Sequence, residues 1–312
     1  MPVADAELRH ALEGVLKRHV RDVHRTAHPY ESSHAIEDVE VVFDEGSPLR
    51  LVFKEMTALS LHASGSRRAT LHDPDREIEA YVHGLAFAGL DVPACYGAVC
   101  EPGRRWLFLE SVDGVPLWQV AGSAAWMQAA GWLAALHARG APAHRGHLMR
   151  YDAAYLQGWL AQALARTPEG ALDGVAAVWE RAVRRLAMWP DAVIHGDFYP
   201  SNVLVQAGPA GSQRIRPVDW ELAGIGPALL DLAALTSGGW TEGERGAIAL
   251  AYHAALPPPA RPAVGALLDT LACARLVVAV QWLGWPRHRP APPEHEHDWL
   301  ADATALTSRI AT

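Results

Sequence analysis

The apolar positions of the first hundred residues follow helical spacing first and strand spacing afterwards. An apolar residue recurs at about every fourth position over 7–24, which predicts an amphipathic helix with an apolar face formed by Leu8, Leu12, Leu16 and Val20. Residues 39–43 alternate in polarity, and residues 49–54 form a β-branched apolar run. The Gly- and Pro-containing stretch 44–48 separates the two runs, so we expect a β-hairpin.

Asp73 and Pro74 stand where a helix is expected to begin, because proline suits the first helical turn; this helix should run to about Leu90. Residues 106–110 predict another strand. The rest of the chain is mostly helical in pattern, with predicted helices at 124–139, 153–165, 175–188 and 263–282, and with short strands at 193–194, 203–205 and 215–219. A small β-rich part therefore precedes a larger helical part, and the class is α+β.

The charge balance excludes two kinds of partner. The chain has 27 basic and 35 acidic residues and a net charge of −8, which would repel a nucleic-acid backbone or an anionic membrane surface. The longest apolar run, 276–283, is short for a membrane span and contains Gln281. Because the N-terminus also lacks a signal-peptide pattern, we expect a cytoplasmic protein without a membrane partner.

Three residue types are scarce enough to be informative. The three cysteines, Cys95, Cys100 and Cys273, are too few for a disulfide framework, so free thiols are expected. Only Lys17 and Lys54 are lysines, although arginine is common, and Asn202 is the one asparagine. Because Lys and Arg differ in shape and hydration, a lysine kept at position 54 indicates a point-charge role.

The segment 194–202 carries the clearest chemistry. Phosphoryl transfer requires a carboxylate facing the attacking hydroxyl and oxygen ligands for Mg²⁺. Asp197 is a candidate for the carboxylate, and Asn202 and Asp219 are candidates for the oxygen ligands. Asp197 and Asn202 lie at the two ends of one short loop that contains Pro200, so both are expected to point into one site.

The segment 194–202 belongs to an ordered series of motifs along the chain. His195-Gly196-Asp197, with Asn202 five residues after the aspartate, is followed by Asp219-Trp220-Glu221 and Asp231-Leu232-Ala233. Upstream, Lys54 ends a strand and Glu77 begins the next helix, while residues 109–112 resemble a hinge that holds adenine and residues 133–138 resemble the helix before a catalytic loop. Together these motifs resemble the aminoglycoside phosphotransferase and choline kinase group over about residues 30–235.

The resemblance implies a bilobal protein-kinase-like fold, with a nucleotide-binding lobe at 1–110 and a catalytic, substrate-binding lobe at 111–312. It also implies ATP and Mg²⁺ as cofactors and a hydroxyl-bearing small molecule as substrate. The implied roles are a catalytic Asp197, metal ligands Asn202 and Asp219, and nucleotide-binding residues Lys54, Glu77, Ser32, Ser33, Glu110 and Val112. Glu79 is an alternative to Glu77 as the ion-pair partner of Lys54. His195 and Asp231 are expected to support the loop rather than react.

The sequence departs from protein kinases in ways that favour a small substrate. Ser32 and Ser33 occupy the place of a Gly-rich phosphate loop, and Tyr199 stands where protein kinases carry a lysine. Ala-Pro-Glu and an activation loop are missing. A nucleotide-binding pseudokinase, or a metal-dependent hydrolase using His195, Asp197 and Asp219, are the alternatives.

The motifs are compatible with several substrate classes: aminoglycosides and other amino sugars, other sugars, choline-like amines, amino alcohols and macrolides. A cationic substrate would require carboxylates, for which the candidates are Asp152, Asp269, Glu294, Glu296 and Asp298. The 12 tryptophans suggest either an aromatic cage or, for Trp126, Trp132 and Trp179 in predicted helices, core packing. We expect core packing for these three. The run 294–298 is expected to be a solvated charge run rather than a metal site.

Overall fold

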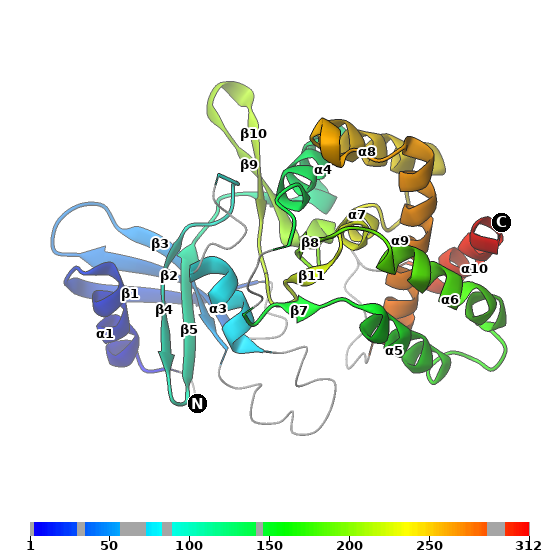
Figure 1. The fold of residues 1–312 in the computed structure, drawn as a ribbon. Coiled ribbons are helices and arrows are strands. Elements are labelled where there is room, and N and C mark those ends of the chain that lie inside the picture. The colour runs from blue at the N-terminus through cyan, green and yellow to red at the C-terminus, as the bar shows by residue number, and fades with distance from the viewer. Residues whose placement is uncertain are drawn as a thin grey trace. The chain divides into compact units, whose positions relative to one another are not determined.

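The structure is a computed structural model that describes residues 3–29, 35–56, 73–82, 89–141, 146–285 and 297–311. The chain divides into two compact units, Met1–Asp113 and Gly114–Thr312 (Figure 1). The first unit is built around a β-sheet and the second is mostly helical. This is the α+β, two-lobed, protein-kinase-like arrangement that the sequence predicted.

The first unit contains a five-stranded antiparallel sheet of order β1-β2-β3-β5-β4. The predicted hairpin is present, since Val41 of β2 lies opposite Leu49 of β3. Apolar side chains of helix α1 pack with the sheet, and the core includes Leu8, Leu12, Val41, Leu51, Phe53 and Phe108. The elements are α1 (Asp5–Leu16), β1 (Val20–Ala27), β2 (Ala35–Phe43), β3 (Leu49–Glu55), α3 (Pro74–Val82), β4 (Cys95–Glu101) and β5 (Arg104–Glu110).

The predicted helix over 7–24 is wrong in its second half. Helix α1 ends at Leu16, and Lys17 adopts a left-handed conformation with φ 54°, from which its N–H donates to the Glu13 carbonyl. Val20 and Val23 belong to strand β1, which pairs with β2. Val20 continued the four-residue apolar series only by coincidence, because it faces the core of the sheet as a β-branched strand residue. Strands β1 and β4 were not predicted.

The second unit combines helices with two three-stranded sheets. One sheet has the order β10-β9-β6 and the other β7-β11-β8. The strands are β6 (Val115–Pro116), β7 (Met149–Arg150), β8 (Asp191–Ile194), β9 (Val203–Ala207), β10 (Gln213–Pro217) and β11 (Gly224–Pro227). The helices are α4 (Ala124–His137), α5 (Ala153–Leu164), α6 (Asp173–Ala187), α7 (Leu229–Leu235), α8 (Glu242–Ala255), α9 (Val264–Gly284) and α10 (Trp299–Ala311).

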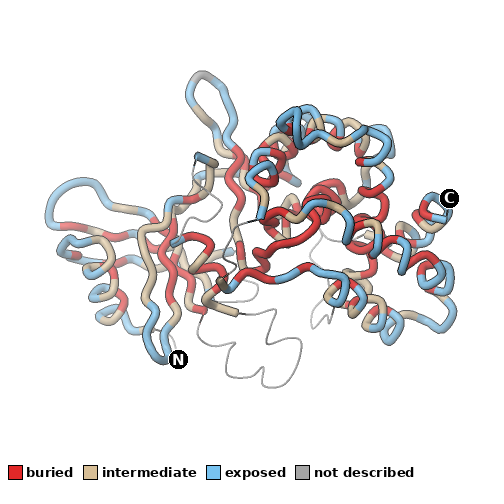
Figure 2. The backbone as a smooth tube through the Cα atoms, viewed as in Figure 1, coloured by how far each residue is buried: buried red, intermediate tan, exposed pale blue. Residues whose placement is uncertain are grey.

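Four of these helices match predicted ones, whereas α7, α8 and α10 were not predicted. Each unit has a core of buried residues, drawn in red in Figure 2. Buried residues also occur in β8 and β9, the strands that flank the loop 195–202. Trp126, Trp132 and Trp179 are buried, which confirms their expected place in the core. Cys95, Cys100 and Cys273 are free thiols, as expected.

Helix α9 corrects the expectation about apolar length. Its 21 residues are long and apolar enough to cross a membrane by length and composition, which the run 276–283 alone did not indicate. However, 67% of its most apolar window is buried inside the structure, against α5, α6, α7 and α10. Arg275 near its middle pairs with Glu242 at 2.9 Å. The apolar character therefore matches that of a central core helix surrounded by other helices.

Candidate active site

Asp197 and Asn202 face each other across the loop between β8 and β9. The Asn202 side-chain amide donates to Asp197 Oδ2 at 2.8 Å and to the Asp197 carbonyl at 3.0 Å. A short 3₁₀ turn, η2 (Pro200–Asn202), starts at Pro200 and brings Asn202 back toward the aspartate. The single asparagine of the chain thus fixes the orientation of the Asp197 carboxylate.

Asp231 on α7 holds the start of this loop from beneath. Its carboxylate accepts hydrogen bonds from the backbone N–H groups of His195 at 2.7 Å and Gly196 at 2.9 Å. His137 Nε2 lies 3.2 Å from Asp231 Oδ2, and His137 Nδ1 lies 3.0 Å from the Tyr252 hydroxyl. Because a buried carboxylate needs several donors, this arrangement is structural and anchors the loop to α4 and α8.

His195 acts as a support within the loop. Its side chain is buried, its Nδ1 accepts the Asp197 N–H at 3.3 Å, and its Nε2 lies 2.9 Å from the Val218 carbonyl. A carbonyl only accepts, so Nε2 carries the proton and the ring is the neutral Nε2–H tautomer. Phe198 is also buried and stacks on Trp132 with ring centroids 5.8 Å apart. Both contacts fix the backbone on either side of Asp197.

Gly196 is required by the close approach of the surrounding chain. Its φ is +80°, and a Cβ at this position would clash with the Leu222 carbonyl and the Tyr151 hydroxyl. The Tyr151 hydroxyl donates to the same Leu222 carbonyl at 2.6 Å. The loop therefore turns at a position where only glycine fits, and Asp197 follows directly from that turn.

Asp219 lies beside this loop because Val218 N–H donates to the Asn202 carbonyl at 2.9 Å. Asp219 has a positive φ of 66°, a conformation that aspartate tolerates better than most side chains. Burial raises the pKa of Asp197 well above its ordinary value, and the negative charges of Asp219 and Glu221 raise it further. The hydrogen bond from Asn202 opposes this rise.

This donor set fits a magnesium ion. Carboxylate and amide oxygens are the ligands that Mg²⁺ prefers, and Asp219 and Asn202 offer one of each. Desolvation is the largest cause of the raised pKa of Asp197, and the negative charges of Asp219 and Glu221 add to it; a cation bound beside these three carboxylates would oppose the second effect.

The first unit contains the predicted nucleotide-binding residues Lys54 and Glu77. Lys54 Nζ lies 2.7 Å from Glu77 Oε1, and the two side chains are only 7% and 1% exposed. Lys54 is therefore a buried cation at the end of β3 whose counter-ion is Glu77 rather than Glu79. A buried, paired lysine is unusual for a strand residue, and the ion pair itself costs desolvation energy.

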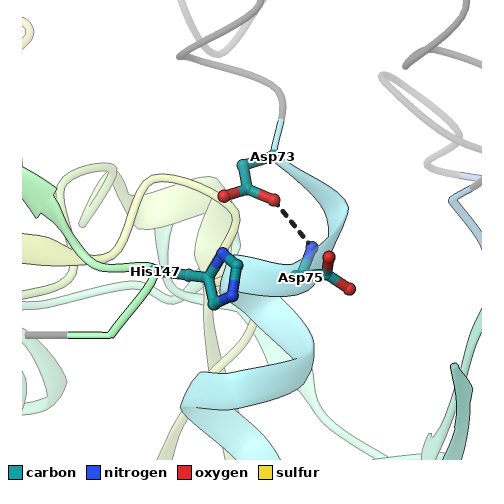
Figure 3. Close-up of side chains that lie close together, drawn as sticks. All are labelled: Asp73, Asp75 and His147. Atoms are coloured by element: carbon teal, nitrogen blue, oxygen red, sulfur yellow. Dashed lines mark hydrogen bonds between the residues drawn. The ribbon is translucent and has the colours of Figure 1, made fainter.

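Helix α3 presents Glu77 because of how it begins. Asp73 Oδ1 accepts the Asp75 N–H at 3.0 Å, and Pro74 follows as the first helical residue (Figure 3). Arg105 Nε of β5 donates to Asp75 Oδ1 at 2.5 Å, which ties the first turn to the sheet. The helix start predicted from Asp73 and Pro74 is therefore confirmed, although the described helix ends at Val82.

The remaining nucleotide-binding candidates lie at two places. Glu110 ends β5, where its N–H donates to the Ala94 carbonyl at 2.8 Å and its carboxylate accepts the Ala94 N–H at 2.9 Å. Its side chain thus braces the end of the sheet, and Val112 lies half-buried two residues later. Ser32 and Ser33 lie outside the residues that the structure describes, as do Glu294 and Glu296.

Two groups of residues escaped the sequence analysis. Tyr151 supports the loop through a contact 71 residues away along the chain. Trp118, Trp240 and Trp299 line a cavity, although we expected most tryptophans in the core. The sequence signal for them was the count of 12 tryptophans, which suggested an aromatic cage as the alternative to core packing.

The fold is that of a two-lobed, kinase-like protein, and a family match shows that the chain is a phosphotransferase. A sequence model of the phosphotransferase enzyme family (APH) matches residues 54–267, which is more than half of the chain. The chain belongs to this family. No curated protein sequence shows significant similarity to it.

Solved structures share the fold at low sequence identity. A microcompartment-associated aminopropanol kinase is 17% identical with a TM-score of 0.60, covering 97% of this chain and 94% of that one. Spectinomycin phosphotransferase APH(9)-Ia, in complex with ADP and spectinomycin, is 11% identical with a TM-score of 0.54, covering 100% and 99%. ADP-bound aminoglycoside phosphotransferase APH(2'')-Ib is 12% identical with a TM-score of 0.56, covering 98% of each chain.

Proposed function

We propose that this protein transfers the γ-phosphate of ATP, with Mg²⁺, to a hydroxyl group of a small molecule. The observation that carries the proposal is the half-buried Asp197 carboxylate, oriented by Asn202 and close to the charges of Asp219 and Glu221. A carboxylate with a raised pKa is a better acceptor for the proton of an attacking hydroxyl. The unit 1–113 would bind the nucleotide and the unit 114–312 would carry the catalytic loop.

Each predicted site residue that the structure describes has a place in this proposal. Asp197 orients the acceptor hydroxyl and takes its proton as the new bond to phosphorus forms. Lys54, held by Glu77, binds the α- and β-phosphates, and Glu110 and Val112 lie in the segment assigned to adenine. Asn202 and Asp219 would hold Mg²⁺, which when bound neutralises charge on the phosphate oxygens.

A metal-dependent hydrolase that uses His195 fits less well. Both ring nitrogens of His195 are engaged, one by the Asp197 N–H and one by the Val218 carbonyl. A histidine in this state offers no lone pair to a metal ion. The hydrolase hypothesis also assigns no role to the buried Lys54–Glu77 pair.

We further propose that the protein works in the cytoplasm. Its three cysteines are free, which is typical of a reducing compartment, and its net charge of −8 does not favour a nucleic acid or membrane partner.

A ³¹P NMR assay tests the proposed reaction. The protein is incubated with Mg-ATP and a panel of amino sugars, sugars, amino alcohols and macrolides, and new phosphate-ester resonances are followed together with ADP formation. The proposal predicts ADP and an ester in equal amounts with at least one acceptor. Stabilisation by Mg-ATP without any ester would instead indicate a pseudokinase, and inorganic phosphate as the sole product would indicate a hydrolase.

A further inference from the structure

An aromatic cavity lies within the second unit, next to the catalytic loop. Its volume is about 220 Å³, and Tyr199 and Pro200, two and three residues after Asp197, form part of its wall. Tyr199 N–H donates to the Asp197 carbonyl at 2.8 Å, so this wall is continuous with the backbone that holds the carboxylate. A molecule in the cavity would therefore lie beside the Asp197 loop.

Indole rings dominate the lining of the cavity. Trp126 and Trp240 meet edge to face with ring centroids 4.6 Å apart, and His297 packs edge to face on Trp299 at 4.7 Å. Trp118 is 39% exposed, which is high for so large an apolar side chain. The lining residues are Trp118, Trp126, Tyr199, Pro200, Ser237, Gly238, Gly239, Trp240, His297 and Trp299.

The cavity wall is also held in a fixed shape. Trp282 Nε1 donates to the Tyr199 hydroxyl at 2.6 Å, and the indole of Trp282 stacks on Trp299 at 5.3 Å. At the lining residue Gly238, the buried Arg245 donates to the Gly238 carbonyl and also to the carbonyl of Thr236. The rings are therefore placed before any ligand binds, which lowers the entropic cost of binding.

Acidic side chains do not contribute to the described lining of this cavity. The described carboxylates that we considered for a cationic substrate serve other contacts. Asp152 caps α5 through the Tyr155 N–H, Asp269 lies 3.2 Å from Arg185, and Asp298 accepts the Ala301 N–H. A polycationic ligand would lose the hydration of several ammonium groups here without gaining a carboxylate counter-ion from the described lining residues.

We propose that this cavity binds the body of the acceptor, and that the acceptor is a small alcohol with an apolar, ring-bearing body rather than a polycationic aminoglycoside. The proposal rests on the proposed function and specifies its substrate class. Pockets for drug-sized ligands span roughly 300–1,000 Å³, so a cavity of this size suits a smaller molecule. Aromatic walls favour a flat apolar body through stacking and edge-to-face contacts.

Calorimetric titration of the full chain tests this directly. The probes are 2-phenylethanol, tyrosol and cyclohexylmethanol as ring-bearing alcohols, and kanamycin as an aminoglycoside. We expect at least one ring-bearing alcohol to bind, with a Kd that rises roughly tenfold in Trp118→Ala, the loss of one ring contact. Trp189→Ala is the matched control, because Trp189 lies outside the described lining, and it should leave the Kd unchanged.

Two results would overturn the cavity assignment. One is the absence of binding by every ring-bearing alcohol, and the other is kanamycin binding that Trp118→Ala leaves unaltered. ADP formation measured on the same samples separates this inference from the proposed function. Phosphorylation of kanamycin would contradict the cavity assignment but support a kinase, whereas Trp118-dependent alcohol binding without any transfer to an alcohol would support the cavity but contradict the kinase.

Discussion

The side-chain amide of Asn202 donates to Asp197 Oδ2 at 2.8 Å. This bond orients the half-buried Asp197 carboxylate, which is flanked by two further negative charges. The same asparagine receives the Val218 N–H through its carbonyl, which places Asp219 beside the loop. Asn202 thus links Asp197, the proposed base, to Asp219, the other proposed metal ligand.

Glu77 should matter far more than its neighbour Glu79. Glu77→Gln removes the counter-ion of the buried Lys54, and we expect unfolding to become easier by about 3 kcal/mol and kcat/KM for ATP to fall at least tenfold. Glu79→Gln is the control, since Glu79 is half-buried on a different face of α3. Urea unfolding and steady-state kinetics check both, and equal effects of the two substitutions would refute the pairing.

Gly196 should not accept even one methyl group. Gly196→Ala places a Cβ against the Leu222 carbonyl and the Tyr151 hydroxyl at a φ of +80°, so we expect a loss of about 3 kcal/mol in stability and loss of activity. Gly122→Ala has a similar φ of +82° but nothing within 4 Å of the new Cβ. Its smaller loss in thermal or urea unfolding isolates the clash from the backbone effect.

The metal-free protein should lose stability as the pH rises. The pKa of Asp197 is raised above its ordinary 3.8, so the native state holds this proton more tightly than the unfolded state does. The tighter binding of this proton stabilises the native state at low pH, and this stabilisation is lost as the pH rises through the raised pKa of Asp197. With EDTA present, the unfolding free energy of Asp197→Asn should therefore rise relative to that of wild type as the pH is raised from about 4. A constant difference over this range would contradict the shift.

Magnesium should restore part of that stability. At a concentration of about 100 times Kd, a ligand that binds only the native state adds about 2.7 kcal/mol, which is a rise in Tm of roughly 5–10 °C. Asp219→Asn should greatly reduce this rise, while asparagine still tolerates the positive φ at this position. Asp113→Asn, an exposed substitution, should preserve it. Differential scanning fluorimetry with MgCl₂ decides, and an unchanged rise in Asp219→Asn would remove Asp219 from the metal site.

Local signals in the sequence were sufficient for much of the fold. The hairpin formed by β2 and β3, the start of α3 at Asp73 and Pro74, and the tight turn before Asn202 all depend on neighbouring residues. The helix predicted over 7–24 extends too far, because Val20 satisfies helical and strand spacing equally well and belongs to β1.

Long-range packing accounts for what the sequence did not indicate. The support of Asp231 by His137 joins residues 94 positions apart, and the contact of Tyr151 with the Leu222 carbonyl joins residues 71 positions apart. No periodic pattern encodes such pairs. The aromatic cavity is similar, because a tryptophan in the core and one in a cavity wall have the same sequence pattern and differ only in how the helices pack.

Phosphoryl transfer by Asp197→Ala tests the central claim most directly. The measurement follows transfer of ³²P from [γ-³²P]ATP to the alcohol that gives the highest ADP formation with wild type, alongside calorimetric titration with Mg-ATP. We predict a loss of at least about a thousandfold in kcat, within the range for removal of a general base, with Mg-ATP affinity changed less than about threefold. Transfer at the wild-type rate by Asp197→Ala would contradict the account.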